Sequence, residues 1–174
     1  ELAGQFSMAM LLIYLVFSSL GDAFSQAYLV ELGKYIQQGR QDIRSLFGKS
    51  LRVVSLTAIG ISLGIALLGE PVLLWVLGPQ WEPAAGMLPM LSLLVPVYFW
   101  SALCFHTLNK ISAQGLILLV YLSRAAVLLV LFFVFYLGGS PEERLILVYV
   151  VNTFFFGLLF VGLTYFFIQN RTGQ

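Results

Sequence analysis

The chain has 174 residues, of which 60% are hydrophobic and 10% are charged, and its formal net charge at pH 7 is +1. Ordinary soluble domains are about 45–50% apolar and about 25% charged, so this composition, with a mean hydropathy of +0.94, excludes a water-soluble globular protein. The basic residues are grouped in separate connections rather than in one patch, so no nucleic-acid partner is expected. The single cysteine, Cys104, lies inside an apolar stretch, which excludes a disulfide framework.

Five apolar stretches follow one another along the chain. Each is near or above the ~20 residues that a helix needs to cross a hydrocarbon core of ~30 Å. Lipid offers the backbone no hydrogen-bond partner, so stretches of this length are stable there only as helices. The sequence therefore predicts an all-α, polytopic bundle of five transmembrane helices, at approximately residues 6–30, 51–77, 84–108, 115–137 and 145–168.

The connections between these stretches alternate in basic content. The first holds Lys34, Arg40, Arg44, Lys49 and Arg52, whereas the second, residues 78–83, holds no Lys or Arg. Lys110 marks the third connection, the fourth is acidic with Arg144 at the start of the next helix, and Arg171 lies in the tail. Because Lys and Arg favour the cytoplasmic side, we expect a multi-pass protein whose first span enters from outside and whose C-terminus is cytoplasmic.

The segment just before the second span has an amphipathic pattern. Ile43, Leu46 and Phe47 repeat at helical spacing, while the basic residues fall elsewhere on the helical wheel. This predicts a short helix on the cytoplasmic interface that runs into the second span, with Asp42 near its N-terminus. Membrane lipids with anionic headgroups are the expected partners of this helix.

Small residues and proline predict two features of helix packing. Gly60 and Gly64 form a GxxxG pattern in the second span, and such faces let helices approach closely in lipid. Pro96 lies in the middle of the third span, where proline removes a backbone donor, so we expect a kink there.

Polar residues within the first span form one stripe. Tyr14, Ser18 and Asp22 recur at spacings of four residues, with Ser7 and Ser25 at the two ends of the stripe. An ionisable residue inside a span usually faces the bundle interior or a wet cavity. Asp22 could therefore line a cavity and bind a cation or a proton. Alternatively, its carboxylate pairs with a neighbouring helix or reaches cytoplasmic water.

Arg124 is a second ionisable residue within a span, with Tyr121 one turn before it. A permanently charged guanidinium at this depth suits an anionic group such as a phosphate. Two alternatives remain open: the side chain snorkels to the cytoplasmic surface, or it forms a structural pair with Asp22.

The sequence gives little support for metal binding or for enzymatic catalysis. With one His and one Cys, the chain offers no metal cluster and no recognisable nucleophile–base pair, and no cofactor is expected. His106, at the cytoplasmic end of the third span, is expected to be a surface residue, and Asn152 to hydrogen-bond between helices. The outer connections are too short to hold an acceptor and a donor substrate, which argues against a membrane enzyme.

Three stretches carry a family resemblance. They are QDIRSLFGKSLR at 41–52, GEPVLLWVLGPQW at 69–81 and PAA at 83–85, which opens a span that runs to Asn109 and Lys110. In these patterns the chain resembles the C-terminal part of bacterial polysaccharide and O-antigen flippases, within the multidrug/oligosaccharidyl-lipid/polysaccharide exporter superfamily.

The resemblance implies a transporter of two six-helix lobes around a central, often cationic cavity. Such proteins move undecaprenyl-diphosphate-linked oligosaccharides to the periplasmic leaflet of the bacterial cytoplasmic membrane for polysaccharide export. Residues 1–174 would then be a fragment that forms most of the C-terminal transmembrane lobe. The absence of an initiator Met before Glu1 fits that expectation.

Three functions follow from these patterns. In a flippase, Arg124 would help to hold the diphosphate, while Ser18 and Asp22, with Tyr14 and Tyr121 nearby, would line the sugar path or bind a coupling ion. In an ion-coupled drug or cation antiporter of the same superfamily, Asp22 would be the coupling carboxylate. A non-transporting scaffold would instead bind glycan polymerase or other assembly proteins, and neither charge would matter to it.

Overall fold

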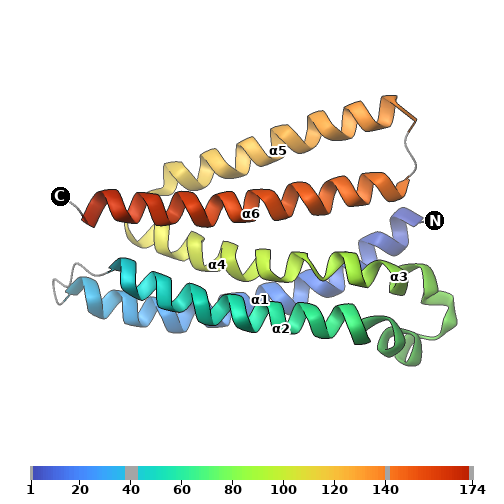
Figure 1. Ribbon diagram of the computed structural model, residues 1–174, viewed down its shortest axis with the longest axis horizontal. Coiled ribbons are helices and arrows are strands. Elements are labelled where there is room, and N and C mark those ends of the chain that lie inside the picture. The colour runs from blue at the N-terminus through green and yellow to red at the C-terminus, as the bar shows by residue number, and fades with distance from the viewer. Residues whose placement is uncertain (1, 38–42, 140–141, 173–174) are drawn as a thin grey trace.

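The computed structural model describes residues 2–37, 43–139 and 142–172, and every regular element within them is helical. The elements are α1 (Leu2–Gln37), α2 (Ile43–Leu77), the short 3-10 helix η1 (Pro79–Trp81), α3 (Glu82–Leu91), α4 (Leu94–Lys110), α5 (Gln114–Leu137) and α6 (Glu142–Thr172). The predicted all-α class is therefore confirmed. Figure 1 shows the long helices running side by side along the length of the molecule.

The centre of the bundle is α4, which packs against α1, α2 and α6, while α5 lies on the outer side of α6 (Figure 1). Being enclosed by neighbours, α4 supplies many of the residues that are no more than 1% exposed, among them Leu94, Phe99, Leu103, Cys104 and Leu108. The central position of α4 therefore brings α1, α2 and α6 together around one helix.

Three helices are long and apolar enough to cross a membrane on their own: Ile43–Leu77, Gln114–Leu137 and Arg144–Gln169. The bent pair formed by Pro79–Leu91 and Leu94–Lys110 makes a fourth if it is counted as one span. Residues 6–30 are helical as part of α1, but α1 is not among these candidates, so the predicted fifth crossing is not confirmed. Large apolar side chains face outward on these helices, such as Leu67, 74% exposed, and Leu129, 72% exposed, an arrangement compatible with a membrane protein.

The third predicted span is bent by 54° between α3 and α4. The break occupies Ser92 and Leu93, just before Pro96, which lacks the N–H that would reach the Ser92 carbonyl in a continuous helix. That carbonyl instead accepts hydrogen bonds from the Val95 N–H at 3.0 Å and from the Ser62 hydroxyl of α2 at 2.8 Å. The kink predicted near Pro96 is confirmed, and a buried serine from another helix compensates for the missing hydrogen bond.

The helix predicted before the second span is observed and runs into that span, because residues from Ile43 onward form the first turns of a continuous α2. Its predicted amphipathic phase is confirmed: Leu46 and Phe47 are buried, whereas Arg44, Lys49 and Arg52 are exposed. Asp42, expected near the helix N-terminus, lies outside the described residues.

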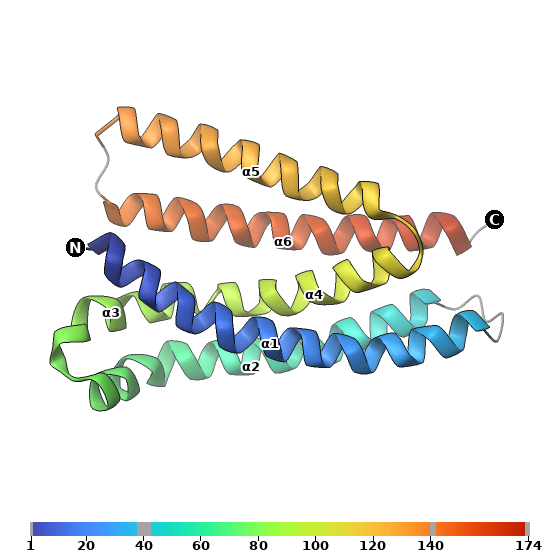
Figure 2. The ribbon, with the colours of Figure 1, turned by 180° about the vertical axis from the view of Figure 1, so that it is seen from behind.

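The two ends of the bundle group the connections as their charges predict. The end of α1, the start of α2, the α4–α5 turn and the end of α6 lie together at one end of the bundle (Figures 1 and 2). The start of α1, η1, α3 and the end of α5 lie at the other end. Which end faces the cytoplasm stays a prediction from the basic residues.

Close helix contact occurs at glycines other than the predicted pair. A Cβ added at Gly60 or Gly64 would meet no atom within 4 Å, so the GxxxG face has no close neighbour in the described chain. On α6, a Cβ at Gly157 would lie 2.9 Å from Val97 Cγ1 of α4, and one at Gly21 of α1 would lie 3.5 Å from Ala102 Cβ. Glycine therefore brings α1 and α6 close to the central helix.

Candidate functional site

A cleft of about 620 Å³ lies between α1, α4, α5 and α6. Its described lining residues are Phe6, Ser7, Met10, Leu11, Tyr14, Val97, Tyr98, Ser101, Tyr121, Arg124, Tyr149 and Thr153. Arg124 is the one charged side chain among them, and four of the others are tyrosines. The cleft thus combines a single cation with aromatic rings that carry hydroxyl groups.

Aromatic contacts attach the first half of α1 to the rest of the cleft. Figure 2 shows α1 crossing over α4, with its N-terminal part reaching toward α6. The ring of Phe6 meets that of Tyr149 of α6 edge to face, with centroids 6.1 Å apart. Tyr14 and Tyr98 of α4 meet in the same way at 5.6 Å. Such edge-to-face pairs fix the relative orientation of the two rings, so α1 forms one wall of the cleft.

Arg124 is held in place by α6. Its Nη2 atom donates a hydrogen bond to the Thr153 hydroxyl at 3.1 Å, and Thr153 is only 2% exposed. A guanidinium has five N–H donors, so this contact orients the group and uses one of them. None of the described carboxylates forms an ion pair with Arg124, and the alternative of a structural pair with Asp22 is therefore not observed. A partly buried cation without an acidic partner favours binding of an anion.

The two predicted tyrosines lie beside this cation. Tyr121 is one turn before Arg124 on α5, and its ring packs edge to face against Phe160 of α6 with centroids 5.9 Å apart. Tyr121 remains 42% exposed and Tyr14 remains 56% exposed, so each has ring surface left for a ligand. The structure therefore brings together three of the five predicted site residues: Tyr14, Tyr121 and Arg124.

Ser18 and Asp22 are not among the described residues that line the cleft. Each step of four residues turns about 40° around an α-helix, so Asp22 lies about 80° around α1 from Tyr14. The predicted stripe therefore rotates away from the cleft. Ser25, at its far end, is buried with 1% exposure.

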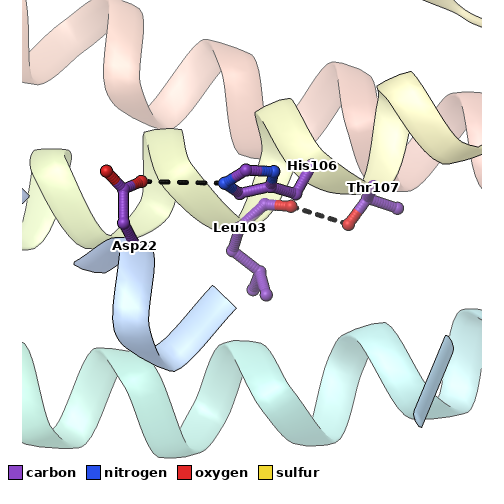
Figure 3. Close-up of polar contacts among 4 residues, drawn as sticks. All are labelled: Asp22, Leu103, His106 and Thr107. Atoms are coloured by element: carbon purple, nitrogen blue, oxygen red, sulfur yellow. Dashed lines mark hydrogen bonds and ion pairs between the residues drawn. The ribbon is translucent and has the colours of Figure 1, made fainter. Parts of the chain in front are cut away.

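Asp22 instead lies beside His106 of α4, with Oδ1 and Nε2 3.6 Å apart (Figure 3). The Asp22 side chain is 60% exposed and that of His106 is 26% exposed, so neither group is enclosed within the bundle. The pair carries opposite charges only when the imidazole is protonated. His106 was expected to be a simple surface residue, and the sequence gives no sign of this partner because the pair depends on the α1–α4 contact.

The next residue along α4 adds a second polar link between these helices. The Thr107 hydroxyl donates to the Leu103 carbonyl one turn earlier, at 2.7 Å (Figure 3), and its oxygen lies 3.2 Å from the hydroxyl oxygen of Tyr28 on α1. Thr107 and Tyr28 are both buried. The Asp22–His106 pair thus lies where α1 is already held against α4.

Sequence reasoning missed Tyr98, Tyr149 and Thr153 in the cleft. A usable signal existed for the tyrosines, because both lie within apolar spans and their hydroxyls need a polar partner or water there. Asn152, expected to hydrogen-bond between helices, is 6% exposed, and its Nδ2 atom has no hydrogen-bond partner among the described residues.

Comparison with known proteins finds no relative of this chain. No protein-family model matches the chain, and neither the curated proteins nor the solved structures include a significant match.

Proposed function

We propose that this chain is the C-terminal part of a flippase that moves an undecaprenyl-diphosphate-linked oligosaccharide across the bacterial cytoplasmic membrane. The observation that carries the proposal is the cleft between α1, α4, α5 and α6, in which one oriented cation lies among tyrosines. The family resemblance of the sequence supplies the substrate class, and the chemistry of the cleft supports it.

Arg124 is the residue that we assign to the diphosphate. A guanidinium binds phosphate oxygens through parallel, charge-assisted hydrogen bonds, which are stronger than neutral ones. The hydrogen bond to Thr153 already orients the Arg124 guanidinium, so this side chain loses little conformational freedom when the anion binds. In the proposed transporter a second lobe faces this cleft and supplies the remaining neutralising charge.

The tyrosines are assigned to the glycan. A sugar ring has apolar faces and a rim of hydroxyl groups, and a tyrosine offers an apolar ring with a hydroxyl at its edge. Tyr14 and Tyr121 line the cleft from two different helices, α1 and α5, and both are exposed. This arrangement suits a chain of sugars attached to an anchored diphosphate.

The bent α3–α4 pair supports a transport role. Discontinuous helices are common in secondary transporters, where one lobe moves against the other around a central site. Here the break is stabilised by the Ser62 hydroxyl of α2 as well as by the Val95 N–H of α4, which both donate to the Ser92 carbonyl. In our proposal the lobe rocks as a unit and the cleft faces each side of the membrane in turn.

The test is transport of lipid-linked oligosaccharide into inverted vesicles that contain the protein with Arg124→Ala. We expect a large loss of transport with an unchanged amount of protein in the membrane. Lys110→Ala is the matched control, since it removes an exposed cation that does not line the cleft. If Arg124→Ala transports as well as the control, Arg124 is not part of the substrate site.

A second candidate, an ion-coupled drug or cation antiporter, is favoured by the Asp22–His106 pair at 3.6 Å. Carboxylate and imidazole groups within spans are the residue types that form proton relays in pumps and transporters. This candidate predicts that Asp22→Asn abolishes proton-coupled efflux. Efflux that survives the substitution removes Asp22 from any coupling role.

A further inference from the structure

A second pocket, of about 300 Å³, lies between α2 and α6, away from the cleft. Its described lining residues are Arg44, Ser45, Gly48, Lys49 and Arg52 of α2, with Tyr165 of α6. None of these residues lines the cleft. The pocket lies at the end of the bundle where the first turns of α2 meet the last turns of α6 (Figure 1), the end predicted to be cytoplasmic.

The helical spacing explains how the pocket forms. Arg44, Gly48 and Arg52 are four residues apart and therefore share one face of α2. Glycine between the two arginines leaves space: a Cβ added at Gly48 would meet no atom within 4 Å. The hollow thus lies where a side chain would otherwise separate the two cations.

Tyr165 fixes one of these cations. The Arg44 Nε atom donates a hydrogen bond to the Tyr165 hydroxyl at 2.8 Å, and the guanidinium carbon lies 4.9 Å from the centre of the Tyr165 ring. Both contacts come from α6, so they hold the guanidinium at the edge of the pocket. A guanidinium that is already oriented loses less freedom when it binds an anion.

The described side chains that line the pocket carry charge of one sign only. Three cations line it, and none of its described lining residues is acidic. Like charges that share a small volume repel one another, so an anion that binds among them is stabilised by all three. A phosphate group matches such a site, because its oxygens can accept hydrogen bonds from several donors at once.

We propose that this pocket binds a phosphate group at one defined site, separate from the transport cleft. Two sources share that chemistry: the headgroup of an anionic phospholipid and a soluble phosphate ester. Beyond Arg52, α2 continues with exposed apolar side chains, including Val53 at 58% and Leu56 at 74% exposure. Acyl chains can lie along this surface while the headgroup occupies the pocket, so a phospholipid is the source that we expect.

The test is native mass spectrometry of the purified protein in neutral detergent, titrated with phosphatidylglycerol and, separately, with glycerol 3-phosphate. We expect one phosphatidylglycerol per chain to bind saturably and more tightly than glycerol 3-phosphate. Binding of the two with equal affinity still supports a phosphate site but assigns it to soluble esters. If neither ligand binds with a defined stoichiometry, the proposal is overturned.

Variants separate a built pocket from general charge attraction. Gly48→Leu fills the hollow and leaves every charge in place, and Arg52→Gln removes one lining cation. Arg52→Gln should weaken binding about tenfold, the effect of losing one charge-assisted hydrogen bond. Gly48→Leu should weaken binding by at least as much, because the leucine side chain occupies the space that the phosphate needs. Lys110→Gln is the matched control, because it removes the same charge at the same end of the bundle but outside the pocket.

Circular dichroism of each variant shows whether the helices are retained, and Gly48→Ala provides a smaller substitution that fills less of the pocket. Unchanged affinity in a folded Gly48→Leu variant contradicts the proposal. So does an equal loss in Lys110→Gln and Arg52→Gln, since net charge alone would then explain the binding.

Discussion

The contact between α4 and α6 at Gly157 provides a quantitative test of how the bundle is packed. A Cβ at this position would lie 2.9 Å from Val97 Cγ1 and 3.2 Å from Val97 Cγ2. Val97 is 3% exposed, and a β-branched side chain has little rotamer freedom on a helix. Gly157→Ala therefore forces the two helices apart by a few tenths of an ångström rather than moving one side chain.

The expected loss of stability in Gly157→Ala is measured against alanine at a second glycine of the same helix. Overpacking a well-packed core costs about 1–3 kcal/mol. Replacing a helical glycine by alanine also stabilises a helix by up to about 1 kcal/mol. A Cβ at Gly162 of α6 would meet no atom within 4 Å, so Gly162→Ala has the second effect alone. We expect Gly157→Ala to be less stable than Gly162→Ala by about 1–3 kcal/mol.

The assay is reversible unfolding of the purified protein in mixed micelles of neutral detergent and sodium dodecyl sulfate, followed by circular dichroism. Val97→Ala provides a further test, because it removes both methyl groups that the new Cβ would meet. The Gly157→Ala penalty should therefore be smaller in the Val97→Ala background. If the two alanine variants are equally stable, the close approach of α4 and α6 described here is incorrect.

Three further predictions concern polar contacts. Thr153→Val removes the hydroxyl that orients Arg124, so transport should fall by less than in Arg124→Ala; a transport assay that shows no change contradicts a positioning role. Ser62→Ala removes one of the two donors to the Ser92 carbonyl at the α3–α4 break, and the Val95 N–H remains, so the protein should be destabilised by about 0.5–1.5 kcal/mol in the same unfolding assay; unchanged stability argues against the Ser62 bond. Asp22→Asn should leave flippase transport nearly unchanged, because Asp22 lies outside the cleft lining; strong inhibition in the vesicle assay would place it on the substrate path.

Local features of the sequence predicted much of the fold. Long apolar stretches predicted the helices because lipid leaves the backbone no other way to satisfy its hydrogen bonds. Pro96 predicted the kink because it lacks the N–H that a continuous helix needs. The apolar spacing before the second span predicted which side of α2 is buried there, with Phe47 fully enclosed and Arg52 exposed.

Contacts between helices could not be predicted in this way. Gly60 and Gly64 have the spacing of a packing motif, yet the close contacts form at Gly157 and Gly21. Which glycine meets a neighbour depends on the position and angle at which two helices cross, and a pattern within one helix does not contain that information.

The same limit applies to the candidate site. The composition of single spans drew attention to Arg124 and Asp22, but whether they meet depends on how α1 crosses α4. In the structure Arg124 contacts Thr153 and Asp22 lies beside His106. The predicted stripe on α1 therefore divides, with Tyr14 in the cleft and Asp22 outside it.

The most direct test of the proposed function is photo-crosslinking of undecaprenyl-diphosphate-linked oligosaccharide to the cleft. A photoreactive phenylalanine analogue is placed either at Tyr121, which lines the cleft, or at Leu122, the next residue of α5, which is 60% exposed and does not line it. The two positions lie at similar membrane depth, so general contact with lipid labels them alike. We predict that the lipid-linked glycan crosslinks at position 121 and not at position 122. Equal labelling at both positions, or no labelling at 121, would contradict the cleft as the substrate site.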